Sequence, residues 1–166
     1  IVAYVHLDHD VIEGRGLLAH DEAGHTLLAD RVREWLARGD RHVTIRPVIN
    51  LNDHCNGSDS AGHDGSDPYV PSFLTAEKVR LRNPTCVFPH CTKKSRSCDL
   101  DHLIAHARTG VTCECNLAPL CRHHHQLKTH AGWRYQQLTP GTFLWREPHG
   151  QTMLVTPTGT RDLTDP

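Results

Sequence analysis

The sequence predicts an α+β protein, made of an N-terminal segment and a module rich in cysteine and histidine. Three observations support this fold class. Apolar residues recur at helical spacing in some segments, apolar and aromatic residues alternate in several short runs, and most of the seven cysteines lie in the middle of the chain. A length of 166 residues accommodates one domain of ordinary size or two small ones.

The N-terminal segment, residues 1–68, is expected to be the tail of a preceding α/β or helical domain plus a linker. Alternating apolar residues in 1–11 predict a strand, and residues 26–38 predict a helix ending near Gly39. Residues 42–51 predict a strand, which Pro47 confines to a sheet edge or a bulge. The Gly-, Ser- and Asp-rich run 53–68 predicts a connector, where we place the domain boundary. Because the chain begins at Ile1 without a methionine, we expect it to be the C-terminal part of a longer protein.

The next elements form the predicted module, residues 69–156. Residues 71–82 predict a helix with Ser72 as its N-cap, and residues 98–103 predict a short strand. A second helix is predicted to run from Asn116, its N-cap, to Lys128. Pro119 falls in its first turn, where the missing N–H costs little.

Three short aromatic or β-branched runs follow, separated by Pro-Gly and Pro-His-Gly turns. They predict a small antiparallel meander whose aromatic residues belong to the core. Residues 157–166 are expected to be a flexible tail.

Charge is unevenly distributed along the chain. Residues 1–77 carry 6 Lys or Arg and 13 Asp or Glu, residues 78–134 carry 10 and 3, and residues 135–166 carry 2 and 3. A local positive excess is expected of a protein that binds a phosphate backbone, although an ordinary solvated surface fits the charge equally well.

With no apolar run of about 20 residues and no signal-peptide pattern, we expect a soluble, cytoplasmic protein without a membrane partner.

Four residues have the spacing of a structural zinc site. Cys86 and Cys91 enclose the tight turn V-F-P-H, while Cys121 and His124 stand three residues apart on one predicted helical face. Together they predict a closed Cys₃His site for Zn²⁺, since a reducing compartment favours metal ligands or free thiols over disulfides. A rival ligand set could instead recruit His90, Cys98, Cys113, Cys115 or His123.

A second group of polar residues is interleaved with the first. Asp101 and His102 end the predicted strand, and His125 follows His124 on the predicted helix. A strand packed against this helix would bring the three side chains together. A carboxylate and an imidazole suit a hard or borderline divalent cation.

The segments D-L-D-H and N-L-A-P-L-C-R-H-H-H-Q-L-K, preceded by C-V-F-P-H-C, resemble the HNH endonuclease family and its ββα-metal fold. The chain is most similar to the bacterial group in which a largely helical N-terminal domain of unknown role precedes a zinc-containing HNH module. The resemblance covers about residues 71–150. It implies that His102 is the general base, that Asp101 and His125 bind a catalytic Mg²⁺ or Mn²⁺, and that Asn116 holds the hairpin and orients the base.

The resemblance implies hydrolysis of DNA phosphodiester bonds, with Lys128 and Arg122 positioning backbone phosphates. The alternative is a zinc-braced nucleic-acid-binding module without cleavage activity. Two features depart from the family pattern. His124 stands where many relatives have cysteine, which suits zinc equally well, and Ala105 stands where proline is common.

Overall fold

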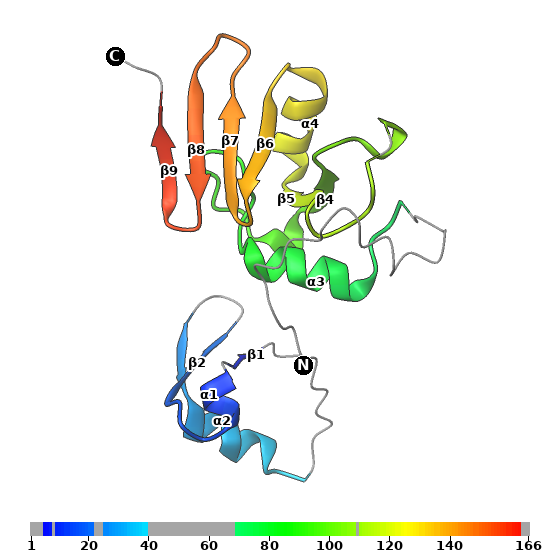
Figure 1. Cartoon of the computed structure of the whole chain (residues 1–166). Coiled ribbons are helices and arrows are strands. Elements are labelled where there is room, and N and C mark those ends of the chain that lie inside the picture. Colours follow the sequence, from blue (N-terminus) through cyan, green and yellow to red (C-terminus); the bar gives the residue numbers. More distant parts are fainter. Residues whose placement is uncertain (1–4, 8, 22–24, 40–68, 109, 164–166) are drawn as a thin grey trace. The chain divides into compact units, whose positions relative to one another are not determined.

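The computed structural model describes residues 5–7, 9–21, 25–39, 69–108 and 110–163 (Figure 1). The chain divides into two compact units, Ile1–Pro47 and Val48–Pro166. The strand predicted at 42–51 and the connector predicted at 53–68 lie outside the described residues. Every helix in the described part of the chain is too short or too polar to cross a lipid bilayer.

The first unit contains a three-stranded antiparallel sheet of order β1-β2-β3 and two helices. Its elements are β1 (Val5–His6), α1 (His9–Ile12), β2 (Leu18–Asp21), β3 (Thr26–Leu28) and α2 (Ala29–Leu36). The strand predicted for 1–11 is therefore wrong at residues 9–11, which belong to α1. The helix predicted for 26–38 begins only at Ala29, three residues later than predicted, because residues 26–28 pair with β2. It ends at Leu36, with Ala37 as C-cap.

The second unit opens with α3 (Phe73–Arg82), as the sequence predicts. The side chain of Ser72 accepts a hydrogen bond from the Thr75 backbone N–H at 3.2 Å, which confirms the predicted N-cap. Two basic residues, Arg80 and Arg82, lie in the last turn, where they complement the helix dipole. A short 3₁₀ helix, η2 (Ser95–Ser97), leads from the cysteine-bearing turn to the next strand.

A two-stranded antiparallel sheet and a helix form the centre of this unit. They are β4 (Asp99–His102), β5 (Leu117–Leu120) and α4 (Arg122–His130), and the 3₁₀ helix η3 (His106–Arg108) lies in the loop between the strands. The helix predicted from Asn116 is wrong over its first turn, because residues 117–120 are a strand. All four strand residues are buried, and the Pro119 carbonyl accepts a hydrogen bond from Val87 N–H at 3.0 Å. Pairing on both edges therefore outweighs the local helix signal.

The C-terminal part is a four-stranded antiparallel meander of order β6-β7-β8-β9 (Figure 1). Its strands are β6 (Arg134–Thr139), β7 (Thr142–Arg146), β8 (Thr152–Thr156) and β9 (Gly159–Asp162). The three predicted runs are confirmed as strands. The prediction of a flexible tail is wrong for residues 159–162, which pair with β8.

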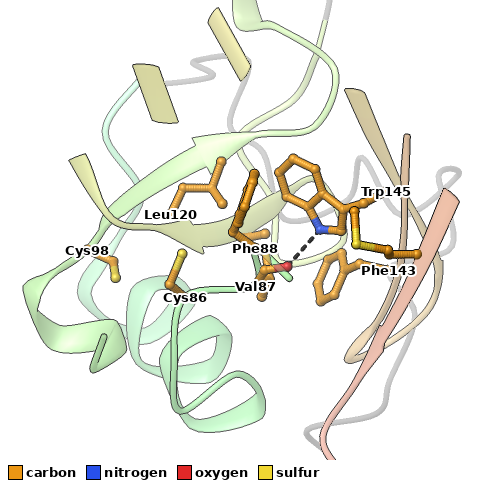
Figure 2. Packing of buried hydrophobic residues seen from close by; sticks show 9 residues of the cluster. Cys86, Val87, Phe88, Cys98, Leu120, Phe143 and Trp145 are labelled. Carbon is orange, nitrogen blue, oxygen red and sulfur yellow. Dashed lines mark hydrogen bonds between the residues drawn. The ribbon is translucent and has the colours of Figure 1, made fainter. Parts of the chain in front are cut away.

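The core of this unit joins the meander to the cysteine-bearing turn. Trp145 and Phe143 of β7 are 0% and 1% exposed, and Figure 2 shows them beside Phe88 and Leu120. The indole N–H of Trp145 donates to the Val87 carbonyl at 2.7 Å, drawn as a dashed line in Figure 2. Phe143 and Trp145 are core residues, as predicted, while Trp133 and Tyr135 are only partly buried against this core.

Candidate functional site

The predicted cysteine and histidine ligands converge. The Sγ atoms of Cys86, Cys91 and Cys121 and a ring nitrogen of His124 all lie within 4.8 Å of one another. Nδ1 of His124 is 3.5 Å from the Cys86 sulfur and 3.2 Å from the Cys121 sulfur. The group could therefore hold a metal ion such as zinc.

Local structure aims these ligands at one point. His90, just before Cys91, has a φ of 59°, a left-handed conformation that tightens the turn between the first two cysteines. Cys121 is the N-cap of α4, and its backbone N–H donates to the Cys86 sulfur at 3.3 Å. The His124 ring stacks on Phe88, with centroids 3.8 Å apart and an interplanar angle of 7°. The site thus joins the turn to the start of α4.

The donor distances fit zinc. In a tetrahedral site with Zn–S of about 2.3 Å and Zn–N of about 2.0–2.1 Å, sulfur and nitrogen stand about 3.6 Å apart. The two observed sulfur–nitrogen distances are close to this value. The rival ligands are not part of the cluster, and the Cys98 thiol instead donates to the Lys94 carbonyl at 3.4 Å.

The electrostatics of the cluster also suit a cation. Burial, with the neighbouring thiols Cys91 and Cys121, raises the pKa of the Cys86 thiol far above its usual range. Three thiolates at this spacing repel one another unless a positive ion lies between them. Burial lowers the pKa of His124, which favours the neutral imidazole that a metal requires.

Two further cysteines behave differently. Burial raises the pKa of the Cys98 thiol to about 11, which makes it an unreactive core residue. Cys115 is in a disulfide, although the sequence reasoning favoured thiols or metal ligands for all the cysteines.

His125 turns to a different set of partners from His124. Its Nε2 lies 3.2 Å from Oδ1 of Asp101, and its Nδ1 lies 2.9 Å from Oδ2 of Asp99. The hydrogen bond from His125 is the largest cause that lowers the pKa of Asp99. Metal-binding histidines characteristically donate their second ring N–H to a carboxylate, which fixes the ring and its tautomer. Asp99 is in the position to do this for His125.

The two oxygens of Asp101 have separate partners. Oδ1 faces His125, while Oδ2 accepts hydrogen bonds from Lys128 Nζ at 2.6 Å and from the Tyr135 hydroxyl at 2.8 Å. Asp101 is 6% exposed, so these two donors satisfy a carboxylate that would otherwise be costly to bury. Burial, followed by the charge of Asp101, raises the pKa of Tyr135 well above its usual range, so the hydroxyl remains a donor.

The Asp101–His125 pair fits a divalent cation by its spacing. Two neighbouring ligand atoms of an octahedral ion, each about 2.1 Å from it, stand about 3.0 Å apart. The observed separation of 3.2 Å between Oδ1 and Nε2 is close to this value. One carboxylate and one imidazole would leave most coordination positions to water and substrate.

His102 lies beside this pair, at the end of β4, and is 6% exposed. Its Nε2 is 2.9 Å from the hydroxyl of Thr112. The ring of Tyr69 stacks on it, with centroids 5.2 Å apart and an interplanar angle of 26°. The imidazole is therefore held on its edge by Thr112 and on its face by Tyr69.

Asn116 holds the loop that follows His102. Its Oδ1 accepts from Ile104 N–H at 2.8 Å, and its Nδ2 donates to the carbonyls of Ile104 and Val111 at 3.0 and 2.9 Å. The side chain thus ties both ends of the loop together and does not cap a helix. A Cβ at Gly110 would lie 1.8 Å from the Ile104 carbonyl oxygen, so the loop packs tightly around this amide.

The two residues predicted to bind phosphate have different surroundings. The Lys128 amine binds Asp101 and also donates to the His102 carbonyl at 2.7 Å, so it belongs to the site itself. Arg122 is largely exposed, and its guanidinium lies 3.4 Å from Asp99 Oδ2.

Four contributors to the site escape sequence reasoning: Tyr69, Asp99, Thr112 and Tyr135. Asp99 has a local signal, because it faces the same side of β4 as Asp101, two residues away. The other three reach the site from distant segments, and their residue types alone give no indication of the contact.

Comparison with known proteins finds similar sequences but does not identify a family. The chain is 46% identical over 94 residues to the uncharacterized protein Rv3776 of Mycobacterium tuberculosis, a match covering 55% of this chain and 18% of the relative. It is also 46% identical over 90 residues to the uncharacterized protein Rv2100 of the same species, covering 54% and 16%. The matches thus span less than a fifth of each relative's length. No family model matches the chain, and no solved structure matches it.

Proposed function

We propose that the second unit is a zinc-braced endonuclease module of the HNH type, which hydrolyses DNA phosphodiester bonds with the help of a divalent cation. One observation carries the proposal. Neighbouring histidines on α4 serve two separate groups, with His124 among the three thiols and His125 paired with Asp101, the residue that precedes His102 on β4. The order β4-β5-α4 supports the ββα-metal fold as the architecture of the site.

In this proposal His102 accepts a proton from the attacking water. Thr112 contacts Nε2 of this imidazole and holds the ring in place. A neutral imidazole can serve as a general base at neutral pH. The hydroxide oxygen forms a bond to phosphorus while the bond to the 3′ oxygen breaks, leaving a 5′ phosphate and a 3′ hydroxyl that takes its proton from solvent.

Asp101 and His125 would hold the divalent cation, which supplies Lewis-acid stabilisation of the phosphate charge when it is bound. The remaining residues position these two. Asp99 fixes the His125 ring, while Tyr135 and Lys128 fix the Asp101 carboxylate through Oδ2. Asn116 holds the loop that follows the base.

A plasmid-nicking assay tests the proposal. The full chain, loaded with zinc, should nick supercoiled DNA when Mg²⁺ or Mn²⁺ is added, and His102→Ala should reduce the rate by at least about 100-fold. Arg161→Gln, which lies on β9, is the matched control and should nick like wild type. Equal nicking by wild type and His102→Ala would refute the assignment of the base.

A binding module without cleavage activity is the second candidate, and one observation favours it. His102 is 6% exposed beneath Tyr69, and the Lys128 ammonium sits on Asp101, so the site as described is closed. DNA binding without nicking under Mg²⁺, Mn²⁺, Co²⁺ or Ni²⁺ would support this reading.

A further inference from the structure

A groove with a volume of about 410 Å³ lies next to the site, along β6 and β7. Lys128 and Tyr135 line it, and both bind Asp101 Oδ2, so the groove begins where the proposed reaction takes place. Arg134 and Arg146 line it further along, and none of its lining residues is acidic.

The two arginines are placed in an unfavourable pairing. Arg134 of β6 and Arg146 of β7 are direct partners in the antiparallel register. Directly opposed side chains have Cβ atoms about 4.5–5.5 Å apart, and like charges at this spacing are destabilising. Both side chains are exposed, and neither makes an ion pair with any residue in the described part of the chain.

An anion between the two guanidinium groups would relieve this repulsion. Arginine forks bind phosphate oxygens through paired, charge-assisted hydrogen bonds. The rest of the groove suits a nucleotide strand better than a lone ion. Gln136 and Leu144 are the next opposed pair on the same face, and Trp133 lines the groove beside them, so the groove offers a hydrogen-bonding group and apolar surface for sugar or base.

We propose that this groove binds the sugar-phosphate backbone of the DNA strand next to the bond that is cut, with Arg134 and Arg146 clamping one phosphate. The inference rests on the proposed function, and it names a substrate-binding surface that extends from Asp101 over the meander. Lys128 links the two parts, because it contacts the carboxylate and faces the groove.

Fluorescence anisotropy with labelled 20-nucleotide DNA tests the groove without requiring cleavage. The zinc-loaded full chain carrying His102→Ala is titrated into single-stranded and duplex DNA at 50–200 mM NaCl without added Mg²⁺. The further double change Arg134→Gln and Arg146→Gln should weaken binding by at least about tenfold. Because the two arginines bind one phosphate, the slope of log K against log salt should become shallower by about 0.7 for single strands and about 0.9 for duplex.

Two control variants separate charge from geometry. Arg161→Gln removes one positive charge from β9, outside the groove, and should leave the affinity unchanged within twofold and the salt slope unchanged. Changing Arg134 and Arg146 to lysine should keep the salt slope but weaken binding, because lysine cannot make the bidentate contact. Zinc content and far-UV circular dichroism check the fold of each variant. Because both arginines are exposed, we expect every variant to fold.

The outcomes distinguish this inference from the proposed function. Unchanged DNA affinity and salt slope in the glutamine double variant would refute the proposal that the groove binds DNA. So would displacement of DNA by 10 mM inorganic phosphate at constant ionic strength, because that result identifies a site for small anions. If wild type fails to nick DNA but the double variant loses DNA affinity, the nuclease proposal is refuted and DNA binding by the groove is supported. If wild type nicks DNA, and Arg134→Gln with Arg146→Gln introduced into wild type leaves the KM for nicking unchanged, the proposed role of the groove is refuted.

Discussion

The neighbouring histidines of α4 should respond to substitution in opposite ways. His124→Ala removes one of the four members of the Cys₃His cluster and the ring that stacks on Phe88. His125→Ala removes two hydrogen-bonded contacts, to Asp99 and Asp101, and leaves the thiol cluster intact. We therefore expect the first variant to lose zinc and the second to lose activity.

The expected magnitudes differ widely. Zinc binding in small structural sites contributes about 10–16 kcal/mol, which is comparable to the whole stability of about 5–15 kcal/mol of a typical domain. A variant that cannot hold zinc should therefore be unfolded at 25 °C. His125 is part-exposed and its contacts are shared with solvent, so its removal should lower the free energy of unfolding by only about 1 kcal/mol.

The assay combines zinc content, by mass spectrometry of the dialysed protein, with thermal unfolding followed by circular dichroism. Wild type and His125→Ala should retain about one zinc and a cooperative transition. His124→Cys is the matched control, because a fourth thiolate restores the ligand set without the imidazole ring. Retention of zinc by His124→Ala together with its loss from His125→Ala would refute the division of roles.

Three further changes test the surroundings of the site. Gly110→Ala would place a Cβ 1.8 Å from a backbone carbonyl oxygen, so chemical denaturation should show that the free energy of unfolding falls by about 3 kcal/mol. Gly39→Ala is the control, because its Cβ meets open space and should change the free energy of unfolding by less than about 0.5 kcal/mol. Tyr135→Phe removes a donor from the buried carboxylate of Asp101; nicking should fall about 10- to 100-fold with zinc retained, and wild-type rates would contradict a positioning role. Burial lowers the pKa of His124 below its unfolded value, so its contribution to stability is present above about pH 6.5 and is lost as the pH falls through the folded pKa. Zinc release followed with a chromogenic chelator should therefore be flat from pH 7 to 8 and rise in acid, and retention down to pH 4 would contradict this.

The convergence of Cys86, Cys91, Cys121 and His124 was predictable because its signal is local. Cys86 and Cys91 flank one tight turn, Cys121 and His124 share one helical turn, and thiolate and imidazole have few other reasons to recur at such spacing. The α3 helix was predictable for the same reason, through its Ser72 cap. Spacing could not exclude the rival ligands, which only the three-dimensional structure separates from the cluster.

Strand β5 shows where local reasoning fails. An asparagine cap and a proline within the first turn are compatible with a helix start, yet residues 117–120 pair with β4 on one edge and contact Val87 through Pro119 on the other. Full burial of all four residues decides in favour of the strand, and burial depends on elements far away in the sequence. The contacts of Tyr69 with His102 and of Tyr135 with Asp101 were unpredictable for the same reason.

The central claim is that one helix serves two metal sites through adjacent histidines. Anomalous difference maps from crystals of the zinc-loaded chain soaked in MnCl₂, collected at the zinc and manganese absorption edges, test it most directly. We expect one zinc peak bound by Cys86, Cys91, Cys121 and His124, and one manganese peak bound by Asp101 and His125. A zinc peak elsewhere, or no manganese at Asp101 and His125, would contradict the account.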